Sequence, residues 1–226
     1  MSEEDKIIRI AIDGPAGSGK STIAQNLAEI LQINYLNSGA LYRIIGYYLD
    51  LKGINPKDLK SVERRLEEIN INIRNNQYFL NREDVTDLIK DSRIGDLASM
   101  YSQISLVRNK VNKIIKNISK DTSIVVDGRD IGTVVLPDSD IKIFLTASIE
   151  ERAKRRWEEE KERNKNSSYQ QILAEIKRRD SNDSNRSLAP LKPAKDAFII
   201  DTTSLSIDQV LNKILNLLKE KKIYGD

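Results

Sequence analysis

The hydrophobic positions of this chain follow two alternating periods. Short, nearly continuous apolar runs are typical of strands covered on both faces of a parallel sheet, and they occur at residues 7–12, 123–127, 141–146 and 197–201. Elsewhere apolar residues recur at helical spacing, which predicts helices at about 21–33, 40–52, 107–118, 148–163, 168–180 and 207–218. This alternation predicts an α/β fold with three layers and a parallel central sheet.

One segment departs from this alternation. Ile69, Ile71 and Ile73 alternate with polar residues, and the pair Asn75–Asn76 that follows is typical of a turn before a second strand. The pattern predicts a small antiparallel β insert at about 69–82.

A further helix is predicted just before the insert. Asn55 followed by Pro56 is typical of an N-cap and a first helical position, so we expect a helix from there to about Glu68. With its insertions, the chain is expected to form a single domain, residues 1–226.

Composition restricts the chemistry that this fold can carry. The 226 residues include no cysteine and no histidine, which excludes thiolate nucleophiles, disulfides, the usual zinc sites and histidine bases. With 37 basic and 34 acidic residues the net charge is +3, which favours small anions over nucleic acid as ligands. No apolar run approaches the roughly 18 residues that span a bilayer, and the acidic start lacks a secretory signal. We therefore expect a cytoplasmic protein with no membrane partner and, since no apolar surface helix is left unassigned, a monomer.

The segment "IAIDGPAGSGKST" at residues 10–22 carries the strongest motif. The pattern G-x-x-x-x-G-K-[ST], between a predicted strand and a predicted helix, is satisfied by Gly14, Gly19, Lys20 and Ser21. Glycines let the backbone amides point at phosphate oxygens, Lys20 can reach the β- and γ-phosphates, and the Ser21 hydroxyl can join the shell of Mg²⁺. We expect a P-loop that binds the phosphates of the donor nucleotide through Gly14, Pro15, Ala16, Gly17, Ser18, Gly19, Lys20, Ser21 and Thr22.

A P-loop identifies the phosphate donor and leaves the acceptor open. Switch GTPases, motor ATPases and small-molecule kinases all use it. The segment "NKII" at residue 112 lacks the aspartate of a guanine-specific N-K-x-D motif, and the strand ending "VVDGRD" places an arginine after its acid. An arginine at that point suits an anionic acceptor better than an attacking water.

Arginines recur where the chain returns to the predicted sheet edge. Their forked side chains bind phosphate oxygens in pairs, and a phosphoryl-transfer site needs several to offset repulsion between two anionic substrates. Each alone is more often part of a surface salt bridge. Together with a P-loop they favour an anionic acceptor, and the candidates are Arg43, Arg108, Arg129, Arg179 and Arg186.

Four segments carry a resemblance to a known family. They read "IDGPAGSGKST", "LNSGALYR", "VVDGRDIGTVVLP" and "RRDSNDSNRSLAPLKPAKDAFIIDT", and they extend from about residue 8 to 203. In content and order they resemble the bacterial cytidylate kinase (CMP kinase) family of P-loop nucleoside monophosphate kinases. The resemblance implies ATP-dependent phosphorylation of CMP and dCMP with Mg²⁺. It also implies a monophosphate-binding region at 40–100 that holds the β insert, and a helical lid at 150–168.

The resemblance also implies roles for individual residues. Ser38, Arg43, Arg129 and Arg186 fall on positions around the acceptor phosphate. Ser99 and Arg108 fall where cytosine is recognised, and Arg179 and Asp183 fall where the pentose hydroxyls are held. Asp127 and Asp130 flank Arg129 and orient it or take part in the outer shell of the metal. The catalytic set is then Lys20, Arg129, Arg186 and Asp130, and the basic residues of the lid are Arg152, Lys154, Arg155 and Arg156.

The physical chemistry of the residues agrees with a monophosphate acceptor. Its second pKa of about 6 leaves it ionised near neutral pH, so no strong base is needed, which fits a chain without histidine. A kinase for UMP or AMP, a kinase for a small alcohol with a carboxylate base, and a nucleotide switch without transfer remain the alternatives.

Two positions depart from the family pattern. Asn37 stands where the family usually has aspartate, which keeps the geometry and removes a charge. The segment "MYSQISLV" between Ser99 and Arg108 lacks the proline common there, which leaves the approach to the base less constrained.

Overall fold

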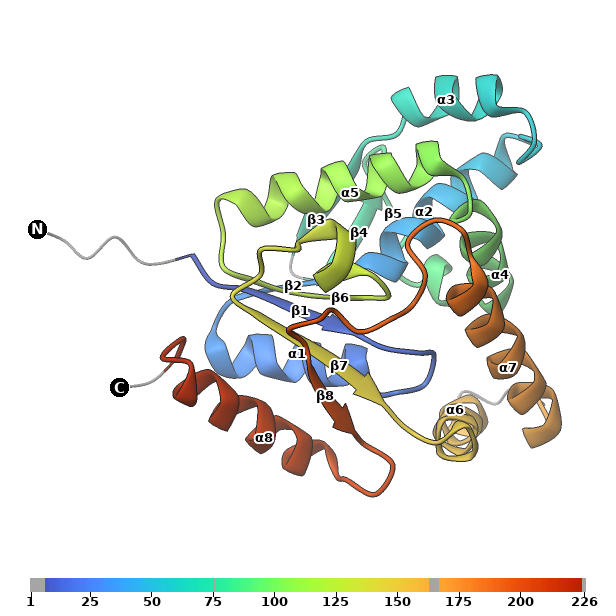
Figure 1. Ribbon diagram of the computed structural model, residues 1–226. Helices are drawn as coiled ribbons and strands as arrows, with labels where there is room; N and C mark the ends of the chain where they lie inside the picture. The colour runs from blue at the N-terminus through green and yellow to red at the C-terminus, as the bar shows by residue number, and fades with distance from the viewer. Residues whose placement is uncertain (1–6, 75, 163–166, 225–226) are drawn as a thin grey trace, which may run out of the picture. The chain divides into compact units, whose positions relative to one another are not determined.

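The computed structural model describes residues 7–74, 76–162 and 167–224 (Figure 1). The chain divides into two compact units, one formed by Met1–Tyr35 with Asp121–Asp226 and the other by Leu36–Lys120. The predicted monophosphate-binding region at 40–100 falls within the second unit. In the predicted lid, residues 163–166 lie outside the described part of the chain.

The first unit is built on a parallel sheet. Its strand order is β2-β6-β1-β7-β8, and β1 pairs in parallel with β6 and β7, as β7 does with β8. The strands are β1 (Arg9–Asp13), β2 (Asn34–Asn37), β6 (Ile124–Gly128), β7 (Ile141–Thr146) and β8 (Phe198–Asp201). The four predicted strands and the parallel sheet are confirmed, whereas β2 was not predicted because "NYLN" contains too few apolar residues to stand out.

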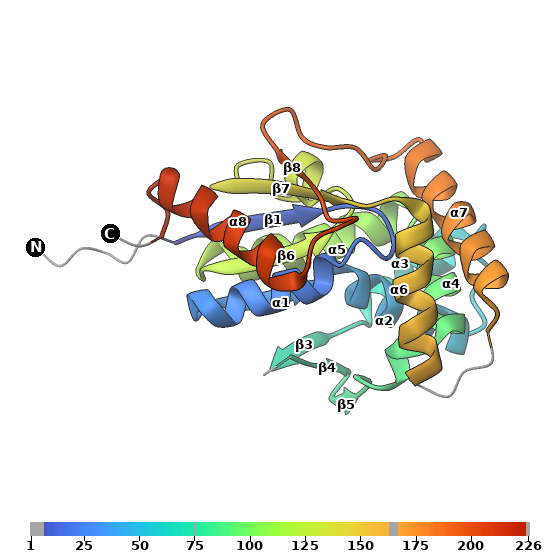
Figure 2. The ribbon, with the colours of Figure 1, turned by 90° about the horizontal axis from the view of Figure 1, so that it is seen from below.

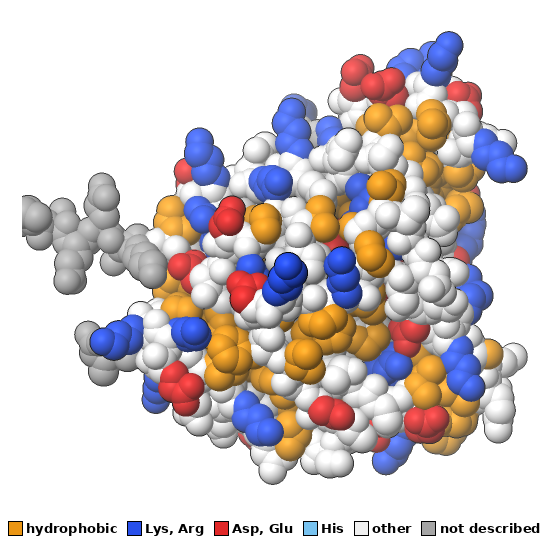
Figure 3. All heavy atoms as spheres, viewed as in Figure 1, with side chains coloured by type: hydrophobic (Ala, Val, Ile, Leu, Met, Phe, Trp, Pro, Cys, Tyr) orange, Lys and Arg blue, Asp and Glu red, His pale blue; other side chains and the backbone are white. Residues whose placement is uncertain are grey.

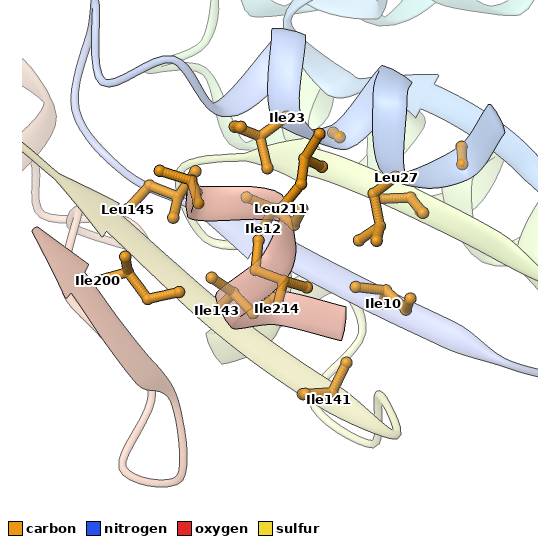
Figure 4. Close-up of a cluster of buried hydrophobic side chains, with 14 of the residues drawn as sticks. Ile10, Ile12, Ile23, Leu27, Ile141, Ile143, Leu145, Ile200, Leu211 and Ile214 are labelled. Atoms are coloured by element: carbon orange, nitrogen blue, oxygen red, sulfur yellow. The ribbon is translucent and has the colours of Figure 1, made fainter. Parts of the chain in front are cut away.

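Helices α1 (Lys20–Leu31) and α8 (Ile207–Glu220) cover one face of this sheet (Figure 2). Figure 4 shows Ile10 and Ile12 of β1 pointing toward Leu27 of α1 and toward Leu211 and Ile214 of α8. All five side chains are buried. Each contributes about 1.5–3 kcal/mol by burial, so this core holds α1 and α8 on β1.

The first unit also contains helices α6 (Ile149–Glu162) and α7 (Tyr169–Asn185) and a short π-helix, η2 (Ile131–Val135). Helix α7 continues past residue 180, where the predicted helix ends, and includes the polar residues 181–185. Asn, Ser and Asp are poor helix formers, so local propensity did not predict this extension. As a result Arg179 and Asp183, four residues apart, lie on one face of a helix.

The second unit combines helices with a small antiparallel sheet. Its elements are α2 (Ser38–Leu51), α3 (Leu59–Glu67), β3 (Ile71–Arg74), β4 (Gln77–Leu80), β5 (Glu83–Asp84), η1 (Leu88–Lys90), α4 (Ser92–Tyr101) and α5 (Ser105–Lys120). Strands β3 and β4 pair antiparallel, with Ile71 opposite Leu80, which confirms the β insert. Asn75 of the predicted turn lies outside the described residues.

The predicted start of the helix at Asn55 is wrong. Helix α3 begins at Leu59, because Asp58 is its N-cap and accepts a hydrogen bond from the Ser61 amide at 3.1 Å. The Asn55 side chain instead accepts from the Lys57 amide at 2.9 Å, which closes a local turn ahead of the helix.

Within the described ranges no helix is long and apolar enough to cross a membrane. On the face that Figure 3 shows, Lys and Arg side chains are interspersed with Asp and Glu side chains and with apolar groups.

Candidate active site

The glycine loop joins the end of β1 to the start of α1, as predicted. Gly14 has φ +156°, and a Cβ atom built there would lie 2.1 Å from the Leu145 carbonyl oxygen, so no larger residue fits without moving the backbone. Gly19, at φ 82°, is the left-handed N-cap of α1 and forms no side-chain cap. The loop therefore lies at the positive end of α1, which favours binding of an anion.

Lys20 lies in the first turn of α1 with its side chain folded onto the loop. Only 7% of the residue is exposed, and its Nζ donates to the Pro15 carbonyl at 3.0 Å. Burial, with a smaller effect from the positive charge of Arg129, lowers the pKa of Lys20 to about 7. A phosphate beside this ammonium would reverse that shift, because an opposite charge favours the protonated form.

The hydroxyl of Ser21 is paired with a buried carboxylate at the end of β6. Asp127 accepts hydrogen bonds from Ser21 Oγ at 2.8 Å and from the Tyr35 hydroxyl at 2.9 Å. Burial raises the pKa of Asp127, and Lys20 and the two hydroxyls act in the opposite direction. No pattern in the sequence predicted a role for Tyr35, whose contact with Asp127 depends on β2 lying next to β6.

This pair fits a magnesium ion. Mg²⁺ binds oxygen and usually takes only one or two protein ligands, completing its shell with substrate phosphates and water. A serine hydroxyl hydrogen-bonded to a carboxylate supplies ligands of that type. Over the described residues no group of three or more Asp or Glu side chains could hold a metal.

A network of arginines and carboxylates joins the loop after β6 to the end of α7. Arg129 Nε donates to Asp183 at 2.6 Å, and Arg186 donates to Asp130 at 3.1 Å while lying 4.0 Å from Asp183. The arginines hold the pKa of Asp183 below its usual range despite its burial. The structure thus brings together two pairs of site residues that lie more than 50 positions apart in the sequence, the pair Arg129 and Asp130 and the pair Asp183 and Arg186.

Arg179 adds a further positive charge to this network. Its guanidinium hydrogen-bonds Glu175 at 3.4 Å, and burial together with the charge of Arg129 lowers its pKa. Since Arg129 also lowers the pKa of Lys20, the cations of this site destabilise one another. An anion carrying several negative charges relieves that repulsion, and a nucleoside triphosphate is such an anion.

Arg152, one of the predicted lid residues, ties three elements together. It is 6% exposed and donates to the carbonyls of Ala16 and Ala147, each at 3.0 Å. It also pairs with Asp180 of α7 at 2.5 Å. The side chain therefore fixes the glycine loop to α6 and α7, a role with no signature in the sequence.

The other basic residues of α6 have separate partners. Arg155 donates to the Thr202 carbonyl at 2.6 Å and to its hydroxyl at 3.0 Å, and that hydroxyl in turn lies 3.3 Å from the Ser18 carbonyl. Arg156 pairs with Glu159 and Glu160. Lys154 lines an open groove of about 410 Å³ together with Ser148, Glu150, Glu151, Trp157, Tyr169 and Thr203.

The remaining predicted residues belong to the second unit. Arg43 on α2 donates to the Ile89 carbonyl at 3.0 Å. Arg108 on α5 is buried, donates to the Ser102 carbonyl at 3.3 Å and lies 5.7 Å from the centroid of the Tyr42 ring. Ser38 is the buried first residue of α2, and Ser99 lies near the end of α4, on which α2 packs.

Asn37 is the N-cap of α2. Its Oδ1 accepts from the Ala40 amide at 3.0 Å, a bond that an aspartate forms equally well. We predict that Asn37→Ala lowers the free energy of unfolding by about 1 kcal/mol, whereas Asn37→Asp changes it by less than about 0.5 kcal/mol. Urea unfolding of the three proteins measures both values, and equal losses in the two variants would contradict the capping role.

Comparisons with known proteins agree on one family. A family model described as cytidylate kinase matches residues 10–220. A protein of Thermosipho melanesiensis named cytidylate kinase is 51% identical over 213 residues, which cover 94% of this chain and 97% of that protein. A cytidylate kinase of Fervidobacterium nodosum is 50% identical over the same shares of the two chains. Among solved structures, an uncharacterized protein from Eubacterium ventriosum superposes with a TM-score of 0.54 at 16% identity, covering 94% of this chain and 98% of that one, and so shares the fold.

Proposed function

This chain belongs to the cytidylate kinase family, and we propose that it transfers the γ-phosphoryl group of ATP to CMP and dCMP. A phosphate oxygen of the acceptor attacks the γ-phosphorus in line while the bond to the β,γ-bridging oxygen breaks, so that ADP leaves and CDP or dCDP forms. The single observation that supports this most strongly is the network of Arg129, Asp183, Arg186 and Asp130 in the same unit as Lys20.

The chemistry asks the protein for positioning and for charge neutralisation. The acceptor oxygen is already ionised near pH 7, since the second pKa of a phosphate monoester is about 6. The amides of the glycine loop and Lys20 bind the donor phosphates, while Arg129 and Arg186 neutralise charge on the transferred group and the acceptor. Asp183 and Asp130 orient the two guanidinium groups through the bonds described above.

Mg²⁺ is part of this proposal. Ser21 would hold it, with Asp127 hydrogen-bonded to the same hydroxyl, and the ion would supply positive charge that offsets the charge of the donor phosphates. We further propose that the protein works in the cytoplasm as a monomer on these small-molecule substrates.

The residues of the second unit are assigned to the acceptor. Ser38 and Arg43 bind its phosphate, and Ser99 and Arg108 bind cytosine. The buried guanidinium of Arg108 is held by the Ser102 carbonyl and the Tyr42 ring, which restrains its orientation toward a base. Arg179 and Asp183 bind the pentose.

A coupled ADP-release assay tests the proposed activity. With saturating ATP and Mg²⁺, kcat/KM is expected to be at least about tenfold higher for CMP and dCMP than for UMP or AMP, because a site built to hydrogen-bond a base leaves polar groups unpaired on the wrong one. A preference for UMP or AMP would move the protein to another monophosphate specificity. ATP binding without transfer to any of the four acceptors would overturn the proposal.

A further inference from the structure

Asp13, the last residue of β1, binds the loop that carries Arg129 and Asp130. Its two carboxylate oxygens accept hydrogen bonds from consecutive backbone amides, Oδ1 from Ile131 and Oδ2 from Gly132, each at 2.8 Å. The residue is 4% exposed. These amides open the π-helix η2, whose N-cap residue Asp130 forms no side-chain cap, so Asp13 caps η2 from 118 residues away.

The segment that Asp13 holds is closely packed at Gly132 and paired with β1 at Gly128. A Cβ atom on Gly132 would lie 3.4 Å from Asp13 Oδ2 and 3.2 Å from the Lys142 side chain. Parallel pairing of β1 with β6 sets Asp13 opposite Gly128, one residue before Arg129. Strand pairing thus anchors the chain to β1 just before Arg129, and the Asp13 carboxylate anchors it again just after Asp130. Both ends of the Arg129–Asp130 segment are therefore held by β1.

The hydrogen bonds of Asp13 connect the donor-binding loop with the arginines assigned to the acceptor. Asp13 directly precedes Gly14, the first residue of the glycine loop. The segment that it holds presents Arg129 to Asp183 and Asp130 to Arg186. One carboxylate thus links the position of the donor loop to that of the arginines assigned to the acceptor.

Burying an ionised carboxylate at this position costs desolvation free energy, which its hydrogen bonds have to offset. Burial raises the pKa of Asp13 to about 6, and the negative charge of Asp130 adds to the shift, whereas the two amides and Lys20 act against it. Charge-assisted hydrogen bonds to two amides are among the stronger ones, and a neutral side chain would not form both.

We propose that Asp13 is a positioning residue for phosphoryl transfer, which fixes the backbone at Asp130–Gly132 and so aligns Arg129 and Arg186 with the donor loop. This inference rests on the proposed function. The roles assigned above to the glycine loop, the arginines and their carboxylates do not include Asp13.

The test compares Asp13→Asn with Asp140→Asn. An asparagine at position 13 keeps one acceptor and turns an NH₂ donor toward a backbone N–H, so one of the two bonds is lost. Asp140 is the matched control, because its carboxylate accepts from the Arg9 amide at 2.9 Å at the other end of the same strand. Misplacement by about 1 Å costs on the order of 100-fold in rate. We therefore expect kcat for CMP to fall about 10- to 100-fold in Asp13→Asn. The dissociation constant of a fluorescent ATP analogue should stay within about threefold in this variant, and Asp140→Asn should keep wild-type turnover.

Three further measurements separate positioning from a general structural effect. Hydrogen exchange at the Ile131 and Gly132 amides is expected to speed up in Asp13→Asn and to stay slow in the control. Gly132→Ala, whose Cβ atom would lie 3.2 Å from the Lys142 side chain and 3.4 Å from Asp13 Oδ2, is a second variant if Asp13→Asn does not fold, and it is expected to lower kcat in the same way. In a double-mutant cycle, Arg186→Ala is expected to cost less in the Asp13→Asn background, because the two residues act on one segment.

The outcomes distinguish this inference from the proposed function. Wild-type kcat in Asp13→Asn, additive effects in the cycle, or equal losses in Asp13→Asn and Asp140→Asn would overturn the positioning role and leave the proposed activity standing. A wild-type protein that binds ATP and phosphorylates no nucleoside monophosphate would overturn the proposed function, and the positioning role with it.

Discussion

Lys20→Met is expected to abolish phosphoryl transfer and to stabilise the fold. Removing one preorganised charge donor from a transition state costs about 10²–10³-fold in kcat, and we expect at least that loss because Lys20 is the cation assigned to the β- and γ-phosphates. The pKa of Lys20 is lowered from 10.5 to about 7 by burial, so the ammonium is less stable in the folded protein than in the unfolded chain. Methionine fills the same space without a charge, and we expect the free energy of unfolding to rise by about 1–3 kcal/mol at pH 7.

The pH dependence of stability gives a second readout of the same residue. Between pH 7 and pH 10.5 the unfolded chain keeps the proton on Lys20 and the folded protein releases it, so the unfolded state binds more protons. The contribution of Lys20 to stability therefore rises with pH across this interval, and it should vanish in Lys20→Met. Urea unfolding at several pH values measures the difference.

Lys142→Met is the matched control for this prediction. Lys142 lies on β7 with a side chain that is mostly buried, and its ammonium is paired with Asp196 at 2.8 Å. The same substitution there should leave turnover within about twofold, because the pair touches no residue assigned to substrate and methionine keeps the Cγ atom that lies beside Gly132. Wild-type kcat in Lys20→Met, or an equal loss in both variants, would contradict the assignment of Lys20 to the phosphates.

The part of the site that could be predicted from the sequence is the part encoded locally. The glycine loop carries its geometry in the spacing of Gly14, Gly19, Lys20 and Ser21, because a strand before it and a helix after it leave one way to expose the amides. The apolar runs of β1, β6 and β7 were likewise predicted, since strands in the middle of a parallel sheet are marked by continuous hydrophobicity.

Partners chosen by the tertiary structure carried no such signal. Asp13 meets the amides of Ile131 and Gly132, and Tyr35 meets Asp127, only because the strand order places β6 between β2 and β1. Nothing within a few residues of either side chain indicates its partner. The resemblance assigned roles to residues of β6 and its loop, but it did not indicate what holds them in place.

The end of α7 shows local propensity yielding to tertiary contacts. The run "SNDSN" at 181–185 lies beyond the helix predicted at 168–180 and consists of poor helix formers, yet it is helical in the structure. Its Asp183 pairs with Arg129, and its carbonyl accepts from the Leu191 amide at 2.8 Å. Contacts that stabilise the helical form in this way are made only once α7 lies beside the loop after β6.

Arg186→Ala is the second substitution expected to have a large effect. The Arg186 side chain is 9% exposed and is held by Asp130 and by the Ala189 carbonyl, so its guanidinium is fixed before any substrate binds. Preorganised charge of this kind, absent in alanine, contributes about 10²–10³-fold to transfer. We expect kcat for CMP to fall by about that factor, with the dissociation constant of an ATP analogue nearly unchanged, because the donor loop is untouched.

A double variant distinguishes the loss of a catalytic contact from the effect of leaving the Asp130 carboxylate without Arg186. Arg186→Ala also leaves the buried Asp130 carboxylate without this arginine, and an uncompensated buried charge can disturb a site by itself. Adding Asp130→Asn removes that charge. If Arg186 acts on the transferred phosphate, the double variant stays as slow as the single one, whereas recovery to near wild-type turnover would show that the arginine serves only to neutralise Asp130.

Arg93→Ala is the control for loss of an arginine ion pair. It breaks a pair with Asp50 at 2.6 Å on a side chain 74% exposed, and it should change kcat by less than about twofold, because exposed ion pairs contribute little.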